Sequence, residues 1–457
     1  MYVPFAENIG IFAVVGLAFA ALYLWWYRRT WTQFYDPYFT SIFIIGLSTC
    51  FVTSVLYVSP VVPLTILAGL LTFLAGFRYG LGNLNGVLKS AAPFRPSKNS
   101  DLVLGALLAF GAIALALDFW VNVRPALGTG TELGGARYLA GANNRFLSIF
   151  GYAARPLPLF FFWLVRSKFL KAGCMAMIAY DPLFSILMGG KSAIFTMPLK
   201  LGAILYFKYA LLGAHRNFAQ SKWERFFKKN RGLCLTAFAG VIFLTLVVTP
   251  FYITKDLSWA GYQTGFTTIS QRFLLGFDSA LMAIQFNMAF PSPGLNLIEL
   301  WFGAPLKVLG LFHGYWNGIN QFVAIHFMML SDDATMQFPN NFIVLEIFGS
   351  IGWIAGIPLL AILSVSLGKL IQHAARNRAS LIWAYWFGYL SVNPVQMLID
   401  GQSFFNMMML GLVMAVPLYF FSTKATGRRR VRFVNFRNFP GGPATSEASR
   451  RSPSRSR

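Results

Sequence analysis

Long apolar runs separated by short polar or basic stretches dominate the chain. Each run covers roughly 17–23 residues with few charges, the length that a helix needs to cross a hydrocarbon layer about 30 Å thick. We therefore predict an all-α polytopic membrane protein with about eleven transmembrane helices. The predicted spans are 9–26, 38–57, 60–76, 102–122, 147–165, 173–190, 192–212, 232–253, 341–363, 379–398 and 403–421.

Basic residues gather in alternate connections between these spans. Of the 38 Lys and Arg residues, 28 follow spans one, three, five, seven, nine and eleven. Basic loops stay on the cytoplasmic side of a membrane, so this alternation predicts an outward N-terminus and a cytoplasmic C-terminus. The net charge of +23 has the same origin, and we expect no nucleic-acid partner.

Two segments depart from the regular alternation. Residues 254–340 form an 87-residue outward loop, too long for a passive connector. Within it, residues 272–290 and 297–312 have the composition of amphipathic or re-entrant helices that lie against the bundle. Residues 424–457 hold ten Lys and Arg and one Glu. We predict a transmembrane domain over 1–423, including the large loop, and a disordered basic cytoplasmic tail over 424–457.

Cysteine usage indicates neither a disulfide framework nor a structural zinc site. Cys50, Cys174 and Cys234 fall in or beside apolar runs, and none has a C-x-x-C neighbour. None has a histidine close by in the sequence either, so neither a disulfide scaffold nor a structural zinc site is expected.

One motif near the end of the large loop carries a family resemblance. Residues 338–356 read FPNNFIVLEIFGSIGWIAG, which resembles the late helix of the oligosaccharide repeat-unit polymerases, the Wzy-type O-antigen polymerases. The layout is also similar, with a basic outward loop at 123–146 and a large outward loop just before this helix. A Gly-Gly-Lys-Ser turn at 189–192 fits as well, although Lys191 stands where an arginine is expected.

The resemblance implies a metal-independent membrane glycosyltransferase without a cofactor, in the bacterial inner membrane with a periplasmic N-terminus. Such an enzyme polymerises lipid-linked oligosaccharide repeat units into O-antigen or exopolysaccharide. It transfers the growing glycan from a polyprenyl-pyrophosphate carrier to the next unit at the outer face. Implied partners are the lipid-linked oligosaccharide, the bilayer, a chain-length regulator and a flippase. Two alternatives stay open: an O-antigen ligase, and a polysaccharide or lipid-linked-oligosaccharide transporter.

This transfer requires cations that hold the leaving pyrophosphate. Arginine suits that role because its planar fork contacts two oxygens at once, whereas lysine is a point charge. Arg137 and Arg145 lie in a Gly/Asn-rich stretch whose backbone N–H groups can add anion contacts. Lys191 and Arg272 are the other candidate phosphate ligands. The alternatives are that Arg137 and Arg145 are ordinary solvated loop charges, and that Arg272 only extends its side chain from an interfacial helix to the membrane surface.

The transfer also requires a base and a surface for the sugar. His313 is a candidate base because a neutral imidazole accepts a hydroxyl proton. Tyr315 and Trp316 can stack on sugar rings, and Asn341 can bind hydroxyls, although aromatic residues also gather at membrane interfaces for physical reasons.

Glu346 is the third candidate catalytic residue. It lies one turn inside a predicted span, where a carboxylate is costly unless it is paired or lines a polar cavity. We expect a pairing with an outward cation such as Arg272, in which Glu346 acts as a base or orients the arginine. A second charge, Arg155, lies inside the span 147–165. It either faces the site or pairs with Asp118 or Asp181.

Overall fold

The computed structural model of the chain describes part of the sequence. The described residues are 9–28, 30, 36, 42–43, 45–47, 49–50, 61–124, 150–151, 154–187, 193–213, 251, 254, 256–265, 283–284, 287–308, 310–311, 342–392, 397–398 and 401–426. Every regular element within these ranges is a helix. The prediction of an all-helical chain is confirmed over this part of it.

Three of the described helices are long and apolar enough to cross a membrane. α3 (Val61–Leu81) is followed closely by α4 (Leu84–Ser90), and α5 (Lys98–Asp118) passes into the π-helical turn η1 (Phe119–Val123). α19 (Ile343–Arg376) has 34 residues. Further apolar helices are α1 (Ile9–Tyr27), α20 (Leu381–Val392) and α22 (Gly401–Thr426). The described part of the chain is thus that of a helical membrane protein.

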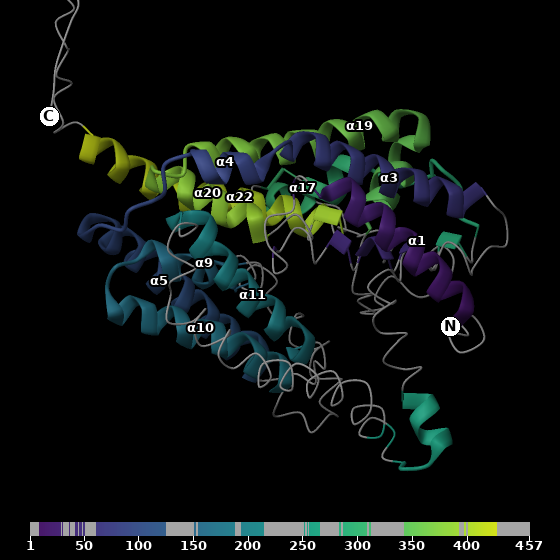
Figure 1. The fold of residues 1–457 in the computed structure, drawn as a ribbon, viewed down its shortest axis with the longest axis horizontal. Coiled ribbons are helices and arrows are strands. Elements are labelled where there is room, and N and C mark those ends of the chain that lie inside the picture. The colour runs from purple at the N-terminus through teal and green to yellow at the C-terminus, as the bar shows by residue number, and fades with distance from the viewer. Residues whose placement is uncertain are drawn as a thin grey trace, which may run out of the picture.

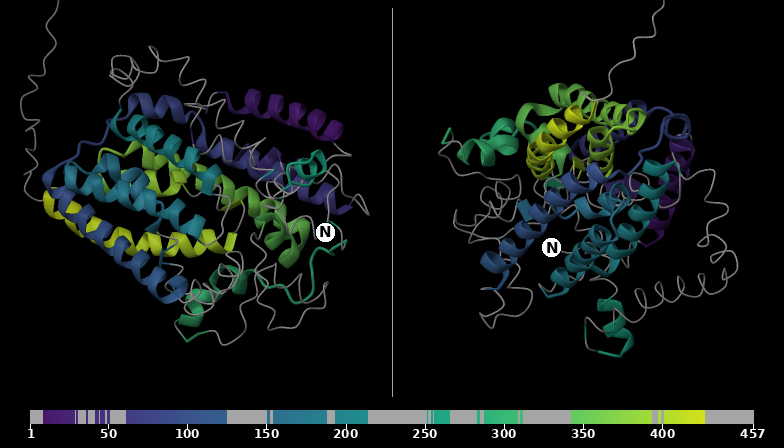
Figure 2. Two further views of the ribbon diagram at one scale, coloured as in Figure 1. Left: turned by 90° about the horizontal axis from the view of Figure 1, so that it is seen from below. Right: turned by 90° about the vertical axis from the view of Figure 1, so that its left-hand side faces the viewer.

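The helices form two groups that pack side by side. α3 and α19 run along one side of the molecule with α20 and α22 beside them (Figure 1). α5, α9 (Leu157–Leu164), α10 (Lys168–Leu187) and α11 (Ala193–Leu212) form the second group. Contacts of α20 with α9, and of α22 with α5, join the two groups. Figure 2 shows the same arrangement from two further directions.

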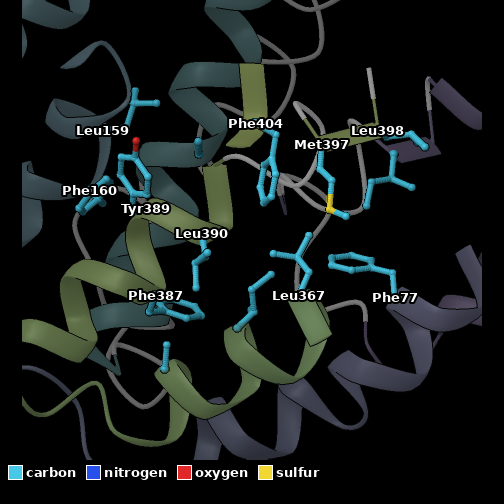
Figure 3. Packing of buried hydrophobic residues seen from close by; sticks show 14 of the residues in the cluster. Phe77, Leu159, Phe160, Leu367, Phe387, Tyr389, Leu390, Met397, Leu398 and Phe404 are labelled. Atoms are coloured by element: carbon cyan, nitrogen blue, oxygen red, sulfur yellow. The ribbon is translucent and has the colours of Figure 1, made fainter. Parts of the chain in front are cut away.

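Aromatic side chains fill the space where α20 meets its neighbours. The ring of Phe160 on α9 lies 6.0 Å from that of Tyr385 on α20. The Tyr385 hydroxyl donates to the carbonyl oxygen of Gly411 at 3.1 Å, and the Tyr389 hydroxyl donates to that of Met407 at 2.6 Å. Figure 3 shows Tyr389 among the buried residues of this region. Each phenol therefore buries its ring and still satisfies its polar end, as an apolar surrounding demands.

α3 and α19 approach each other closely because small residues face one another. A Cβ atom added at Gly80 would lie 2.4 Å from the carbonyl oxygen of Val365 and 2.9 Å from the Cα of Gly368. A Cβ added at Gly368 would lie 2.7 Å from the carbonyl oxygen of Phe77. Four residues earlier on α3, Gly76 faces Ser364. This spacing of small residues is typical of helix pairs in membranes, where close backbone contact replaces the hydrophobic effect.

The loops at one end of the bundle are fastened to one another by hydrogen bonds. The Phe94 amide donates to the carbonyl oxygen of Leu211 at 2.8 Å. The Asp101 carboxylate accepts the backbone amides of Arg166 at 2.5 Å and Ser167 at 2.9 Å, just before α10 begins. We call this end the capped end; it comprises residues 88–101, 166–168, 211–213 and 376–380.

Several helices begin or end outside the predicted spans. α5 begins at Lys98 rather than 102, because Ser97 and Ser100 form a capping box at its start. α10 begins at Lys168 rather than 173, and α19 continues to Arg376 rather than 363. The helices extend past the predicted spans because hydropathy marks the hydrocarbon limit, whereas capping and packing determine where the helix itself stops.

Arg378 is completely buried in the capped end, although it lies in a turn that the sequence assigns to a basic loop. Its guanidinium donates to the carbonyl oxygens of Ala375 at 3.0 Å, Leu88 at 2.6 Å and Ala91 at 3.0 Å. These carbonyls belong to the C-terminal ends of α19 and α4, where a cation is favourable. Burial lowers the pKa of Arg378 to about 10. One arginine thus joins the ends of two helices.

Replacing Arg378 by alanine should lower the stability of the purified protein by about 3 kcal/mol or more. The change removes three charge-assisted hydrogen bonds and leaves buried carbonyl groups without this donor. Thermal unfolding in detergent measures the effect. The matched control is Arg376→Ala, because Arg376 is exposed two residues earlier. Equal melting temperatures for the two variants would contradict a joining role for Arg378.

Candidate functional site

Glu346 lies in the first turn of α19 and is 0% exposed. Its amide nitrogen bonds to the carbonyl oxygen of Phe342 at 3.1 Å, which closes that turn, and Ser350 donates to its carbonyl oxygen at 2.7 Å. A carboxylate in the first helical turn is stabilised by the helix dipole and the N–H groups there. The start of α19 therefore offers an anion-stabilising position inside the bundle, at the end opposite the capped end.

Trp301 binds the Glu346 carboxylate from α17 (Leu297–Val308). Its indole Nε1 donates to Oε2 of Glu346 at 2.7 Å, and the tryptophan is 7% exposed. The Trp301 ring also stacks on Phe405 of α22, with 4.3 Å between the ring centroids. The large loop, in which the sequence predicts a helix over 297–312, thus reaches the buried acid through α17.

Gly401, the first residue of α22, completes the surroundings of the acid. A Cβ atom at this position would lie 2.2 Å from Oε2 of Glu346 and 3.2 Å from Nε1 of Trp301. Only a glycine allows the backbone to approach the carboxylate so closely. We call Trp301, Glu346, Gly401 and Phe405 the Glu346 site; it joins α17, α19 and α22.

α19 is broken shortly after the acid. Gly352 has φ 77° and ψ 168°, which separates a short segment carrying Glu346 from the long remainder of α19. The carbonyl oxygen of Gly349, in this short segment, accepts the amide of Ser292 at 2.6 Å. Pro291 lies against Gly352, 3.3 Å from where a Cβ would be. The large loop therefore binds α19 both at the acid and at the break.

A second group of polar side chains lies at the same end of the bundle. Nη2 of Arg155 is 3.8 Å from Oδ2 of Asp118, so the structure pairs Arg155 with Asp118, one of the two partners that the sequence left open.

Only Glu346 among the predicted site residues lies within the described part of the chain. Its observed hydrogen-bond partner is Trp301, and a pairing with Arg272 involves a residue outside that part. The other candidates outside the described residues are His313, Arg137, Arg145, Lys191, Tyr315, Trp316 and Asn341. Their predicted roles stay predictions.

Sequence reasoning missed Trp301 and Gly401. The sequence does place Trp301 in a helix predicted within the outward loop, two residues after Glu299. That position was the available signal for Trp301. Nothing in the sequence distinguished Gly401 from other glycines, because its role depends on a contact with a residue 55 positions earlier. Comparison of the chain with protein-family models, curated proteins and solved structures finds no match.

Proposed function

We propose that the protein is a membrane-embedded glycosyltransferase that joins lipid-linked oligosaccharide repeat units into a polysaccharide. The observation that carries the proposal is the buried Glu346 at the start of α19, held by Trp301 from the large loop. This acid lies within residues 338–356, the motif on which the family resemblance rests. A polymerase of this type requires an acidic or cationic site at the outer end of its helices, under the large loop.

The proposed orientation has eleven spans, with the capped end in the cytoplasm. Basic residues gather at that end, at the ends of several helices and in the connections between them, as expected of a cytoplasmic face. They are Arg95, Lys98, Arg166, Lys168, Arg376 and Arg378. The starts of α19 and α22, which form the Glu346 site, lie at the opposite end. This arrangement supports a site on the outer face of a bacterial inner membrane.

Within this proposal, Glu346 acts on the acceptor hydroxyl or orients a cation that does so. The enclosure of its carboxylate favours the orienting role, because a base must come within hydrogen-bond reach of the proton that it removes. His313 is then the proposed base, and Arg137, Arg145, Lys191 and Arg272 are the proposed pyrophosphate ligands. The reaction needs no metal, since the cations stabilise the leaving pyrophosphate.

A transporter is the second candidate, and the break in α19 favours it. Many transporters bind their substrates at helices that are interrupted inside the membrane. Gly352 interrupts α19 in this manner, next to Pro291 of the large loop. The chain shows no internal sequence repeat of the kind that marks many such proteins, and an 87-residue loop is unusual for them. We therefore place the polymerase first and keep the ligase as its close relative.

Deleting the gene in its host separates the polymerase from the two other candidates. On a gel, surface polysaccharide chains of different lengths form a ladder of bands. Loss of a polymerase leaves single repeat units on the surface lipid, so that this ladder is reduced to one band. Loss of a ligase or a transporter removes even the first unit. A surface polysaccharide that keeps its full ladder after the deletion would refute all three.

Arg272→Ala, expressed in the deletion strain, should abolish the ladder while the protein level in the membrane stays normal. The reason is that the variant removes the proposed bidentate contact with the leaving pyrophosphate. Arg376→Ala at the capped end is the control, because it removes an equal charge far from the site. An unaltered ladder in Arg272→Ala would exclude Arg272 as a pyrophosphate ligand.

A further inference from the structure

We infer that residues 256–265 form an interfacial anchor, whose apolar side chains enter the outer surface of the lipid bilayer. Leu257 is 86% exposed and Trp259 is 70% exposed. Apolar side chains with this exposure are unfavourable in water and favourable at a membrane surface, where tryptophan in particular gathers. The inference concerns the partner of this surface and does not depend on the chemistry proposed for Glu346.

Hydrogen bonds within the segment determine how the two apolar side chains are presented. The Asp256 carboxylate accepts the backbone amide of Ser258 at 2.8 Å and the hydroxyl of Ser258 at 2.7 Å. The Ser258 hydroxyl in turn accepts the amide of Gly261 at 3.0 Å. A Cβ atom at Gly261 would lie 2.4 Å from the carbonyl oxygen of Asp256, so the turn closes tightly. Leu257 and Trp259 therefore belong to a locally ordered turn at the start of a short helix.

Aromatic contacts connect this turn with the end of the preceding predicted span. The ring of Trp259 stacks on that of Tyr262, with 5.2 Å between the centroids and 17° between the planes. The ring of Phe251 lies 5.3 Å from that of Tyr262. Phe251 falls near the end of the predicted span 232–253. The exposed residues thus follow directly after the point where the chain leaves the hydrocarbon layer, which is the level of the lipid head groups.

The surroundings of Trp259 favour a lipid surface over a sugar chain as the partner. A small polar ligand needs hydrogen-bonding groups beside the aromatic ring that fix its orientation. The adjacent acid in the sequence, Asp256, already binds Ser258 with both carboxylate oxygens. Leu257 is even more exposed than Trp259, and an exposed leucine next to a tryptophan is typical of helices that lie in a membrane surface. In Figure 1 the segment lies apart from the main bundle, in teal at the lower right.

A second tryptophan marks the outer membrane surface on another helix. α5 begins at the capped end, so the turn η1 that follows it lies at the opposite end. Trp120 in this turn is 61% exposed, and the guanidinium carbon of Arg124 lies 4.0 Å from the centroid of its ring. Trp120 comes 22 positions after Lys98, a helical length of about 33 Å that agrees with the thickness of the hydrocarbon layer. Tryptophan at the head-group level with an arginine that reaches the phosphates is the expected composition of that surface.

Fluorescence quenching in proteoliposomes tests the inference. The full chain, with its three cysteines replaced by alanine, carries the change Leu257→Cys, and a fluorophore is attached to this thiol. Phosphatidylcholine with a nitroxide on its acyl chain should quench the fluorophore, whereas iodide on both sides of the membrane should not. Ala379→Cys is the matched control, because Ala379 is exposed in the turn between α19 and α20. A fluorophore there should be quenched by iodide and not by the nitroxide lipid.

Trp259→Cys, labelled in the same way, should give the same result as Leu257→Cys, and it keeps the test open if one of the two variants does not fold. Quenching by iodide at 257 and 259 to the same extent as at 379 would overturn the anchor. Iodide quenching at these two positions that added polysaccharide relieves would also overturn it, in favour of a sugar-binding surface.

Discussion

Glu346→Gln should lose at least about 99% of polysaccharide ladder formation while the protein folds normally. Glutamine has nearly the same shape, and its Oε1 can still accept the N–H of Trp301, so the variant removes the charge and little else. A contribution of about 100-fold or more is typical of a carboxylate that takes part in proton transfer or in orienting such a group. The ladder is measured on gels after expression in the deletion strain, alongside membrane protein level and melting temperature.

The reason to expect a dependence on charge is the position of the acid. An ionised carboxylate inside a helical bundle costs several kcal/mol, a cost that a neutral hydrogen-bond acceptor avoids. If Glu346 only accepted the Trp301 N–H, the neutral residue would serve at least as well. Glu299→Gln is the control, because Glu299 is an exposed carboxylate on the same helix as Trp301. A normal ladder in Glu346→Gln would show that the acid has a structural role only.

Within the described residues, hydropathy predicted the three long apolar helices α3, α5 and α19, but it could not predict where they end. α4 and the last turns of α19 extend beyond the apolar runs, because Arg378 binds the carbonyl groups at the ends of both helices. This contact joins residues that are 290 positions apart in the chain. The sequence identified Arg378 as a loop charge, since burial of a guanidinium by carbonyl oxygens leaves no local pattern.

Of the candidate site, the sequence predicted the acid and the presence of a helix in the large loop. The cost of a carboxylate in a span singles out Glu346 without any structure. Its expected partner was a cation, because opposite charges are the common solution to that cost. The structure shows a hydrogen bond from Trp301, so that an indole N–H and the start of α19 contribute to the stabilisation. The pairing with Arg272 involves a residue outside the described part of the chain and stays a prediction. The contact with Trp301 could not be predicted, because it depends on the three-dimensional packing of α17 on α19.

The close pairing of α3 with α19 leads to the second large expected effect, on folding rather than on activity. Gly368→Leu should prevent the protein from accumulating as a single monodisperse species. The atoms that would meet the new side chain are backbone atoms of Phe77, Gly80 and Leu81, at 2.7–2.8 Å from its Cβ. Backbone cannot rotate away as a side chain can, so the whole of α19 must separate from α3. Overpacking commonly costs about 1–3 kcal/mol, and a backbone clash lies at or above the upper end.

Gly10→Leu is the matched control, because a Cβ at Gly10 has no atom within 4 Å. It makes the same change on α1 and should leave size-exclusion behaviour and melting temperature close to those of the parent. The pairing of α3 and α19 also determines where Glu346 lies, since Val344 and Phe348, on either side of the acid, pack against Gly69 of α3. Gly368→Leu should therefore abolish the ladder together with the folded protein, whereas Glu346→Gln should abolish the ladder alone. If Gly368→Leu folded and kept the ladder, α3 and α19 could not be in backbone contact at this point.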